Sequence, residues 1–177
     1  MKRFVIIVLM MGLQSCSTTY DNKNPVGKNF VAIVGNSLDG KTWQIPEDLK
    51  GGTNLLLLGY KQRSQFDIDR WLIGLDMSKT AVNVFEIPAI QSWFAGLFRA
   101  SIDEGMRKGI PGELWKVVIT VYDDGDKIQE FTGNENPNNA RVVLLNKAGV
   151  VQFFYDRGFS VAALNQLRAA IAGLPQK

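Results

Sequence analysis

The pattern of hydrophobic and polar positions predicts that strands and helices alternate through the middle of the chain. The run from Asn54 to Gly59 holds four consecutive leucines and ends in glycine, which is typical of a central strand covered on both faces. The next hydrophobic residues recur at the spacing of one helical face: Ile68, Trp71, Leu72 and Leu75. Ser64 and Asp67 have the spacing of a capping box near the start of this helix.

The remaining pattern predicts a mixed α/β sheet with helices on both faces. Ahead of the central strand, residues 30–45 read as two short strands with a turn at Asp39-Gly40. Behind it we expect a strand over 81–87, a helix over 90–106, a strand over 115–121, a turn over 123–126, a hairpin of strands over 141–145 and 150–155, and a final helix capped by Ser160. Alternation followed by an antiparallel pair favours a mixed sheet over a purely parallel one.

The N-terminus has the pattern of an export signal. Lys2 and Arg3 precede an apolar run from Phe4 to Met11, which is shorter than the roughly 20 residues of a membrane span. The residues Leu13-Gln14-Ser15-Cys16 resemble a lipobox, the motif cut before a cysteine that then carries a diacylglyceryl thioether and an N-acyl chain such as palmitate. The alternative is a plain secretory signal in which Cys16 is incidental.

This interpretation divides the chain into three parts. Residues 1–15 form the signal peptide, residues 16–29 the lipidated cysteine with a flexible polar tether, and residues 30–177 one domain. The acylated Cys16 would hold the protein in a lipid bilayer of the cell envelope, facing the periplasm. Ser17 follows where some bacteria place a retention aspartate for the inner membrane, so its identity favours the outer membrane.

Charge and composition exclude several classes of function. Of the 20 basic residues, Lys2 and Arg3 precede Cys16 and no acidic residue does, so the mature chain is close to neutral and nucleic acid is not an expected partner. The chain has no histidine and one cysteine. We therefore expect no histidine base, no metal site, no cofactor and no assigned catalytic residue.

Three stretches resemble the thioredoxin-like superfamily. Leu38-Asp39-Gly40-Lys41 followed by Ile45-Pro46 is similar to the opening of peroxiredoxin-like domains. The run from Arg141 to Val151, with Gly158 and the helix after it, is similar to the superfamily's closing hairpin. Arg99 to Gly109 is similar to relatives of the mitochondrial ATP synthase assembly factor. The resemblance implies a thioredoxin-like fold with a C-terminal β-hairpin and helix.

The functional motifs that this resemblance implies are missing. Redox-active members carry Cys-x-x-Cys after the first long strand, where one thiolate attacks and a second thiol resolves the mixed disulfide. Here that segment, from Gly59 to Gln65, contains no cysteine. The superfamily's cis-proline, just before the strand over 141–145, has no match here, because the sequence at that place is Asn138-Asn139-Ala140. Thiol catalysis is therefore not carried over to this chain.

The segment after the central strand is still a candidate binding loop. A helix N-terminus presents free amides and positive potential, to which these side chains would add donors: Tyr60, Lys61, Gln62, Arg63 and Gln65. An anion or a carboxylate of a partner would fit there. The alternative is a solvated loop whose charges only keep the protein soluble.

The sequence favours a non-catalytic, membrane-tethered thioredoxin-like module that binds, or assists the assembly of, an envelope or membrane protein. Two other classes stay open, namely a thiol oxidoreductase or peroxidase relative and a purely structural envelope lipoprotein. The first of these lacks its thiols in the candidate loop. Capture of one defined partner would separate a binding module from a structural lipoprotein.

Overall fold

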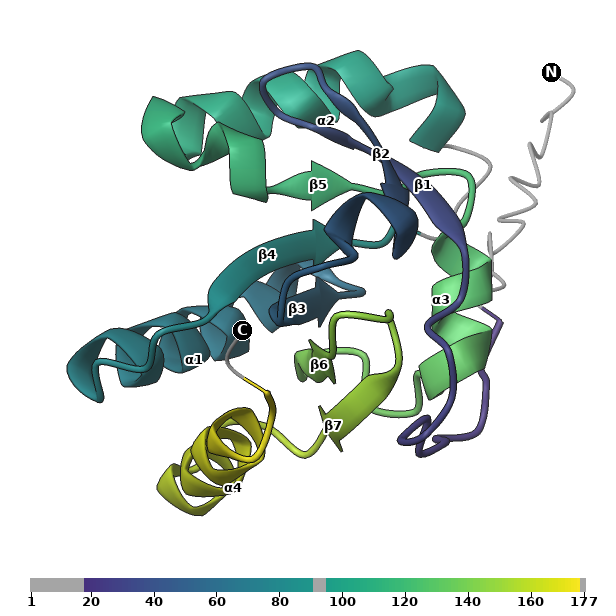
Figure 1. Ribbon diagram of the computed structural model, residues 1–177. Coiled ribbons are helices and arrows are strands. Elements are labelled where there is room, and N and C mark those ends of the chain that lie inside the picture. Colours follow the sequence, from purple (N-terminus) through teal and green to yellow (C-terminus); the bar gives the residue numbers. More distant parts are fainter. Residues whose placement is uncertain (1–17, 91–94, 176–177) are drawn as a thin grey trace, which may run out of the picture.

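The computed structural model describes residues 18–90 and 95–175. One sheet has the strand order β4-β3-β6-β7 and the other the order β2-β1-β5 (Figure 1). The strands are β1 (Ile33–Ser37), β2 (Thr42–Ile45), β3 (Asn54–Gly59), β4 (Asn83–Pro88), β5 (Ile119–Thr120), β6 (Arg141–Leu145) and β7 (Val151–Tyr155). β3 runs parallel to β4 and antiparallel to β6, which confirms the predicted mixed sheet.

The two sheets meet at the edge of β4. Isolated parallel bridges join Glu86 to Val118 and Ala89 to Val121, on either side of the short strand β5. The hairpin of β1 and β2 then continues the layer through antiparallel pairing of β1 with β5. The N-terminal hairpin is in this way attached to the central sheet by residues that follow α2.

Helices cover both faces of the central sheet. They are α1 (Gln65–Met77), α2 (Ala95–Gly109), α3 (Gly125–Thr132) and α4 (Val161–Ala172), with short 3-10 helices at Glu47–Leu49, Gln62–Ser64 and Gly112–Val117. Helices α1 and α4 pack side by side on one face, and α3 with the β1–β2 hairpin covers the other (Figure 1). None of the helices in the described ranges combines the length and apolar character of a membrane span.

The four leucines of β3 form the centre of the core. Leu55 and Leu57 point to the layer of α1 and α4, whereas Leu56 and Leu58 point to the layer of α3, and all four are fully buried. Burial of each side chain contributes about 2 kcal/mol to folding. The predicted central strand is confirmed, and it fixes where the chain emerges at Gly59, at the start of the candidate loop.

Two predicted segments differ in the structure. The expected turn over 123–126 is the beginning of helix α3, because Ile128 and Phe131 at helical spacing pack into the core. The expected strand over 115–121 is shorter in the structure: the residues up to Val117 belong to a 3-10 helix, and Ile119–Thr120 form β5 with a single bridge on either side of it. There the amide of Leu38 donates to the carbonyls of both Trp115 and Val118, which favours a tight coil over a ladder.

Other boundaries shift by a few residues. Pro88 ends β4 and does not open the following helix, whose described part begins at Ala95. Residues 91–94, which belong to the helix predicted over 90–106, lie outside the described residues. Ser160 caps α4 as predicted, since its Oγ accepts a hydrogen bond from the amide of Ala163 at 3.1 Å.

Candidate functional site

The candidate loop begins where β3 ends, and it has one buried residue and four exposed ones. Tyr60 points inward and is 6% exposed, whereas Lys61, Gln62, Arg63 and Gln65 are exposed. A 3-10 turn over 62–64 leads directly into α1. A Cβ at Gly59 would lie 2.7 Å from the Oγ of Ser64, so the sharp corner needs glycine at this position.

The predicted capping box of α1 is wrong. The Oγ of Ser64 donates to the carbonyl of Lys61 at 2.6 Å and makes no cap bond to the helix. The carboxylate of Asp67 instead accepts the amides of Ala140 at 2.9 Å and Phe159 at 2.7 Å. Asp67 is 6% exposed, so it joins α1 to the segments before β6 and α4 inside the protein.

Tyr60 is a core residue with a buried hydroxyl. Its OH shares a hydrogen bond of 2.6 Å with the Oγ1 of Thr132, and it lies 3.4 Å from the carbonyl of Ile128 on α3. Burial raises the pKa of Tyr60 well above its ordinary value, and the bond to Thr132 opposes this only in part. Tyr60 is therefore a neutral group that ties β3 to α3.

Arg141 lies over Tyr60 and is fully buried. Its guanidinium carbon is 4.9 Å from the centroid of the Tyr60 ring, a cation–π arrangement. Nη1 donates to the carbonyls of Asn136 at 2.5 Å and Asn139 at 3.0 Å, while Nε has no hydrogen-bond partner. Among the described residues no carboxylate forms an ion pair with it, and desolvation lowers the pKa of Arg141.

Sequence reasoning missed this role of Arg141. The available signal is an arginine as the first residue of an otherwise apolar strand. The guanidinium holds the loop before β6 through its carbonyls, at the position where the superfamily resemblance implies a proline. It also closes the inner side of the candidate loop, because it stacks on Tyr60.

Residues 18–29, which we call the N-terminal strap, are packed against the domain, where the sequence predicted a flexible tether. The amide of Tyr20 donates to the side-chain oxygen of Asn134 at 2.7 Å, and the amide of Asn134 donates to the carbonyl of Tyr20. The amide of Lys23 donates to the carbonyl of Thr132, and Gly27 donates to Val151. These contacts bind several of the strap's backbone groups to the domain, so residues 18–29 lie against it despite their polar composition.

The strap also covers Arg141. Nη2 of Arg141 lies 3.4 Å from the Oδ1 of Asn22, and the same oxygen accepts the amide of Glu135 at 3.3 Å. A Cβ at Gly133 would overlap the backbone of Asn22, so strap and loop touch without any intervening side chain. Gly133 has a φ of 79°, which adds a second reason for glycine there.

The exposed half of the loop is partly directed toward carboxylates. Nε2 of Gln65 donates to Asp69 at 3.0 Å and lies 3.5 Å from an oxygen of Glu86 on β4. Burial raises the pKa of Glu86, an effect that the Gln65 contact opposes and the charge of Asp69 reinforces. Lys61 and Arg63 make no side-chain hydrogen bond or ion pair with the described residues, so their role in anion binding stays a prediction.

The structure adds no metal or cofactor chemistry to this picture. Within the described residues, no cluster of three acidic, cysteine or histidine side chains has the arrangement of a metal site. The proposed lipidation residue Cys16 and the signal segment 1–15 lie outside the described residues. The site therefore consists of a closed inner part, Tyr60 with Arg141, and an exposed outer part, Lys61 to Gln65.

The fold of this chain is similar to that of many solved structures. No protein-family model and no curated protein sequence matches the chain. The exposed lipoprotein thioredoxin Etrx1 of Streptococcus pneumoniae matches with a TM-score of 0.53 and 16% identity, over 78% of this chain and 98% of that one. A SCO1/SenC family lipoprotein of Bacillus anthracis matches with a TM-score of 0.58 and 12% identity, over 87% and 99%.

A third neighbour extends the range of functions that share this architecture. The thiol peroxidase of Chromobacterium violaceum matches with a TM-score of 0.55 and 13% identity, over 88% of this chain and 91% of that one. The likeness to the ATP synthase assembly factor stays a prediction, and at these identities the structural matches establish the fold alone. The chain thus has a thioredoxin-like fold, and the loop from Tyr60 to Ser64, where the sequence resemblance implies a Cys-x-x-Cys motif, contains no cysteine.

Proposed function

We propose that this protein is a non-catalytic thioredoxin-like module, anchored by a lipid on Cys16, that binds or helps to assemble an envelope or membrane protein. The observation that carries the proposal is that the loop after β3 has no cysteine and is closed by packing on its inner side. Tyr60 and Arg141 stack on each other at the point where β3 ends, and Asn22 of the strap covers them. A buried, thiol-free corner offers no place for disulfide exchange.

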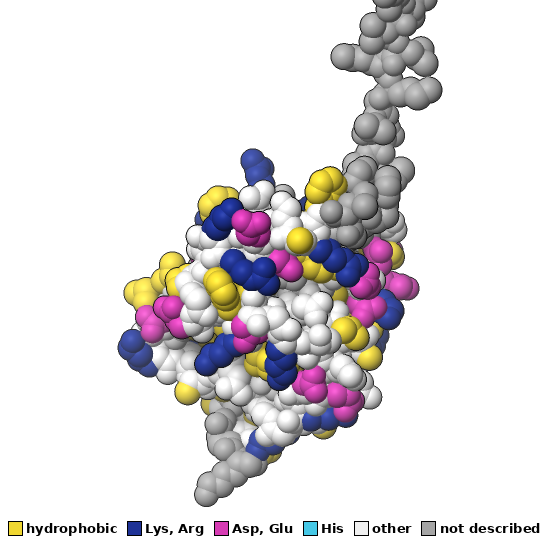
Figure 2. All heavy atoms as spheres, turned by 90° about the horizontal axis from the view of Figure 1, so that it is seen from above, with side chains coloured by type: hydrophobic (Ala, Val, Ile, Leu, Met, Phe, Trp, Pro, Cys, Tyr) yellow, Lys and Arg dark blue, Asp and Glu magenta, His cyan; other side chains and the backbone are white. Residues whose placement is uncertain are grey.

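Chemistry argues against the alternative of a thiol oxidoreductase or peroxidase. Exchange requires a thiolate that attacks a disulfide, and a peroxidase likewise needs a reactive thiolate. The only cysteine of the chain is Cys16, whose sulfur would be blocked as a thioether, and there is no histidine to activate another nucleophile. Surface charge is a separate point. In the view of Figure 2, basic and acidic side chains are interspersed, and no basic stripe is seen.

The N-terminal pattern supports the envelope location. Lys2, Arg3, the apolar run and Cys16 follow one another in the order of a lipoprotein signal. Two structural neighbours, Etrx1 and the SCO1/SenC family protein of Bacillus anthracis, are described as lipoproteins. Ser17 favours the outer over the inner membrane in cells that sort lipoproteins by the residue at this position.

An activity assay tests the non-catalytic part. Insulin reduction and peroxide turnover by the mature protein should stay at background, with or without dithiothreitol pre-treatment, and a thioredoxin and a thiol peroxidase serve as positive controls. The Cys16→Ser variant should give the same readings. Turnover that is above background and disappears in this variant would contradict the proposal.

Labelling with a fatty acid tests the anchor. Cells that produce Cys16→Ala should incorporate no label into this protein, because the lipid attaches through that sulfur. The neighbouring substitution Ser17→Ala leaves the sulfur in place and should retain the label. Equal labelling of both variants would show that Cys16 is not the lipidated residue.

A further inference from the structure

Helix α1 carries an exposed hydrophobic stripe on the side away from the core. Phe66, Ile73 and Met77 are 70%, 58% and 77% exposed, and their spacing places them along one side of the helix. Arg70, also exposed, lies between them on the same side. Single exposed hydrophobic residues are common, but a stripe of three with a cation between them marks an interaction surface.

Ile73 and Met77 of this stripe line one wall of a groove between α1 and α4. The groove has a volume of about 460 Å³, and its other wall comes from α4, where Val161 is 67% exposed above Leu164. Its floor is tight, because a Cβ at Gly74 would lie 2.8 Å from the ring of Phe159. The glycine lets the two segments approach and leaves an apolar channel above them.

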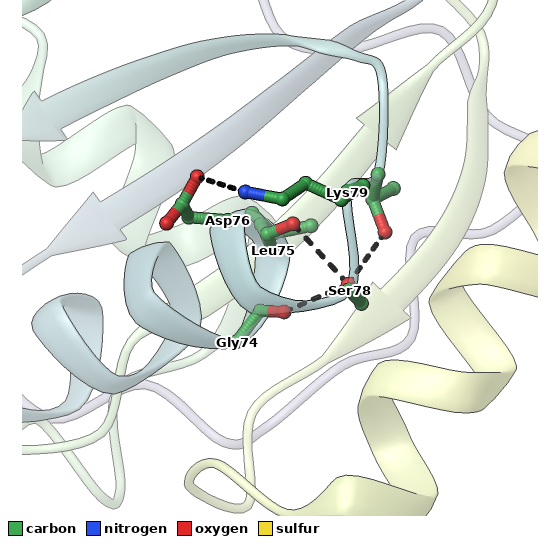
Figure 3. A network of polar contacts seen from close by, with 6 residues as sticks. Gly74, Leu75, Asp76, Ser78 and Lys79 are labelled. Carbon is green, nitrogen blue, oxygen red and sulfur yellow. Dashed lines mark hydrogen bonds and ion pairs between the residues drawn. The ribbon is translucent and has the colours of Figure 1, made fainter.

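The end of this groove is held rigidly. Ser78, which follows α1, donates to the carbonyl of Gly74 at 2.7 Å and bonds the hydroxyl of Thr80 at 2.7 Å (Figure 3). Lys79 is beside Asp76, so it is directed back along the helix (Figure 3). A turn that is already hydrogen-bonded adds no ordering cost of its own when a partner binds at this end of the groove.

The charges at the groove have one sign. Arg70 and Arg168 line it from α1 and α4, and no acidic residue is part of its lining. Arg168 lies 3.5 Å from the amide oxygen of Asn165, and Arg70 forms no ion pair with a described residue. An occupant with an apolar face and carboxylates beside it complements this arrangement.

The position of the groove argues for a protein and against the anchoring membrane. The carbonyl of Thr18 accepts a hydrogen bond from Asn134, and Ser17 alone separates Thr18 from Cys16, a span of about 7 Å of extended chain. A lipid on Cys16 would hold the strap's side of the domain against the bilayer. The strap lies at the right of Figure 1, whereas α1 and α4 lie at the lower left, so the two helices that line the groove are on a different side of the domain from the strap.

We infer that the groove between α1 and α4 is the partner-binding surface and that it takes an amphipathic helix of another protein, with its apolar side on Ile73 and Val161 and its carboxylates at Arg70 and Arg168. Such helices dock by apolar anchors at i, i+3 or i+4, and i+7, which suits a channel along the 13 residues of α1. This inference rests on the proposed binding function and names its surface.

Site-specific photo-crosslinking in cells tests the surface. A photoreactive residue at 73 or 161 should capture one partner, identified by mass spectrometry, whose attached peptide is an acidic amphipathic segment. The same residue at Leu114, which is exposed by 47% on another part of the protein, should not capture it. Capture only from position 61 would overturn the groove but leave the binding function standing, and capture from none of these positions would overturn both.

Charge reversal tests the chemistry of recognition. With the captured segment as a synthetic peptide, the double variant Arg70→Glu and Arg168→Glu should bind at least tenfold more weakly, and a peptide with lysines in place of its carboxylates should restore binding. Both arginines are exposed, so the melting temperature should stay close to that of the wild type. Unchanged affinity, adducts only to phospholipid, or adducts only to a second copy of the chain would each overturn the inference.

Discussion

The guanidinium of Arg141 lies 4.9 Å from the ring centroid of Tyr60, and both side chains are buried. This contact joins the first residue of β6 to the residue after β3, two points that the antiparallel register brings together through the pairing of Leu58 with Arg141. The cation has no carboxylate partner among the described residues, so backbone carbonyls and an aromatic ring stabilise its charge. The corner is closed as a result.

Arg141→Ala should lower the free energy of unfolding by about 3 kcal/mol. The substitution leaves the carbonyls of Asn136 and Asn139 without their donor and opens a cavity beside Tyr60. Urea unfolding of the purified domain measures the change. Arg157→Ala is the matched control, because Arg157 also stacks on a tyrosine but is exposed, and its loss should cost less than about 1 kcal/mol. Equal effects would show that burial of Arg141 is not stabilising the corner.

Asp67→Asn should destabilise the domain by about 2 kcal/mol. The carboxylate accepts two buried amides, from Ala140 and Phe159, whereas an asparagine offers one oxygen and turns a donor toward the other amide. Thermal melting at neutral pH measures the loss. Asp69→Asn, on the exposed side of the same helix, should leave the melting temperature nearly unchanged. A small effect at both positions would contradict the assigned contacts.

Gly133→Ala should detach the N-terminal strap. The added methyl group overlaps the backbone of Asn22, so the strap must move, and the backbone at Lys23, which is bonded to Thr132 in the wild type, becomes more accessible to trypsin. Limited proteolysis should cut the variant at Lys23 faster than the wild type. Gly40→Ala has the same kind of positive φ, at 93°, but nothing within 4 Å, so it controls for backbone strain alone. If both variants are cut equally fast, strain rather than strap contact governs the result.

Glu86→Gln should raise the melting temperature at pH 7. Burial raises the pKa of Glu86 in the folded protein above its unfolded value, so the stability that its protonated form contributes is present below about pH 4 and is lost as the pH rises. Glutamine stays neutral and can still accept from Gln65. The advantage of the variant should therefore shrink as the pH falls toward 4. Exposed Glu113→Gln should change little at either pH, and a pH-independent advantage of Glu86→Gln would contradict this cause.

Much of the fold can be predicted from the sequence because its signals are local. A run of leucines ending at Gly59 identifies the central strand. Hydrophobic spacing identifies Ile68, Trp71 and Leu75 as the face of α1 that packs on it, whereas Leu72, predicted for the same face, is exposed. Helix α3 was missed, since its eight residues begin with acidic and glycine residues that also suit a turn. Short elements of this kind depend on core contacts, here those of Ile128, more than on their own propensity.

Part of the candidate site can likewise be predicted from the sequence, and part cannot. The absence of cysteine from the loop after β3 and of histidine from the chain is determined by the sequence alone, because no folding can supply a missing functional group. The sequence also identified Lys61 and Arg63 as exposed cations at a helix start. It assigned Tyr60 to the same loop surface, but the side chain turned inward.

Only the tertiary structure decided where Tyr60, Asp67 and Arg141 make their contacts and how residues 18–29 lie. Each of these contacts joins segments far apart in the chain, such as Asn22 with Arg141. The residues next to either partner in the sequence do not indicate which distant residue it contacts. The polar composition of the strap suits a solvated linker equally well. The strap is packed because Asn134 accepts a hydrogen bond from its backbone and because Gly133, without a side chain, leaves room for it. Local pattern determines the elements, whereas buried polar pairing depends on the register that brings distant groups together.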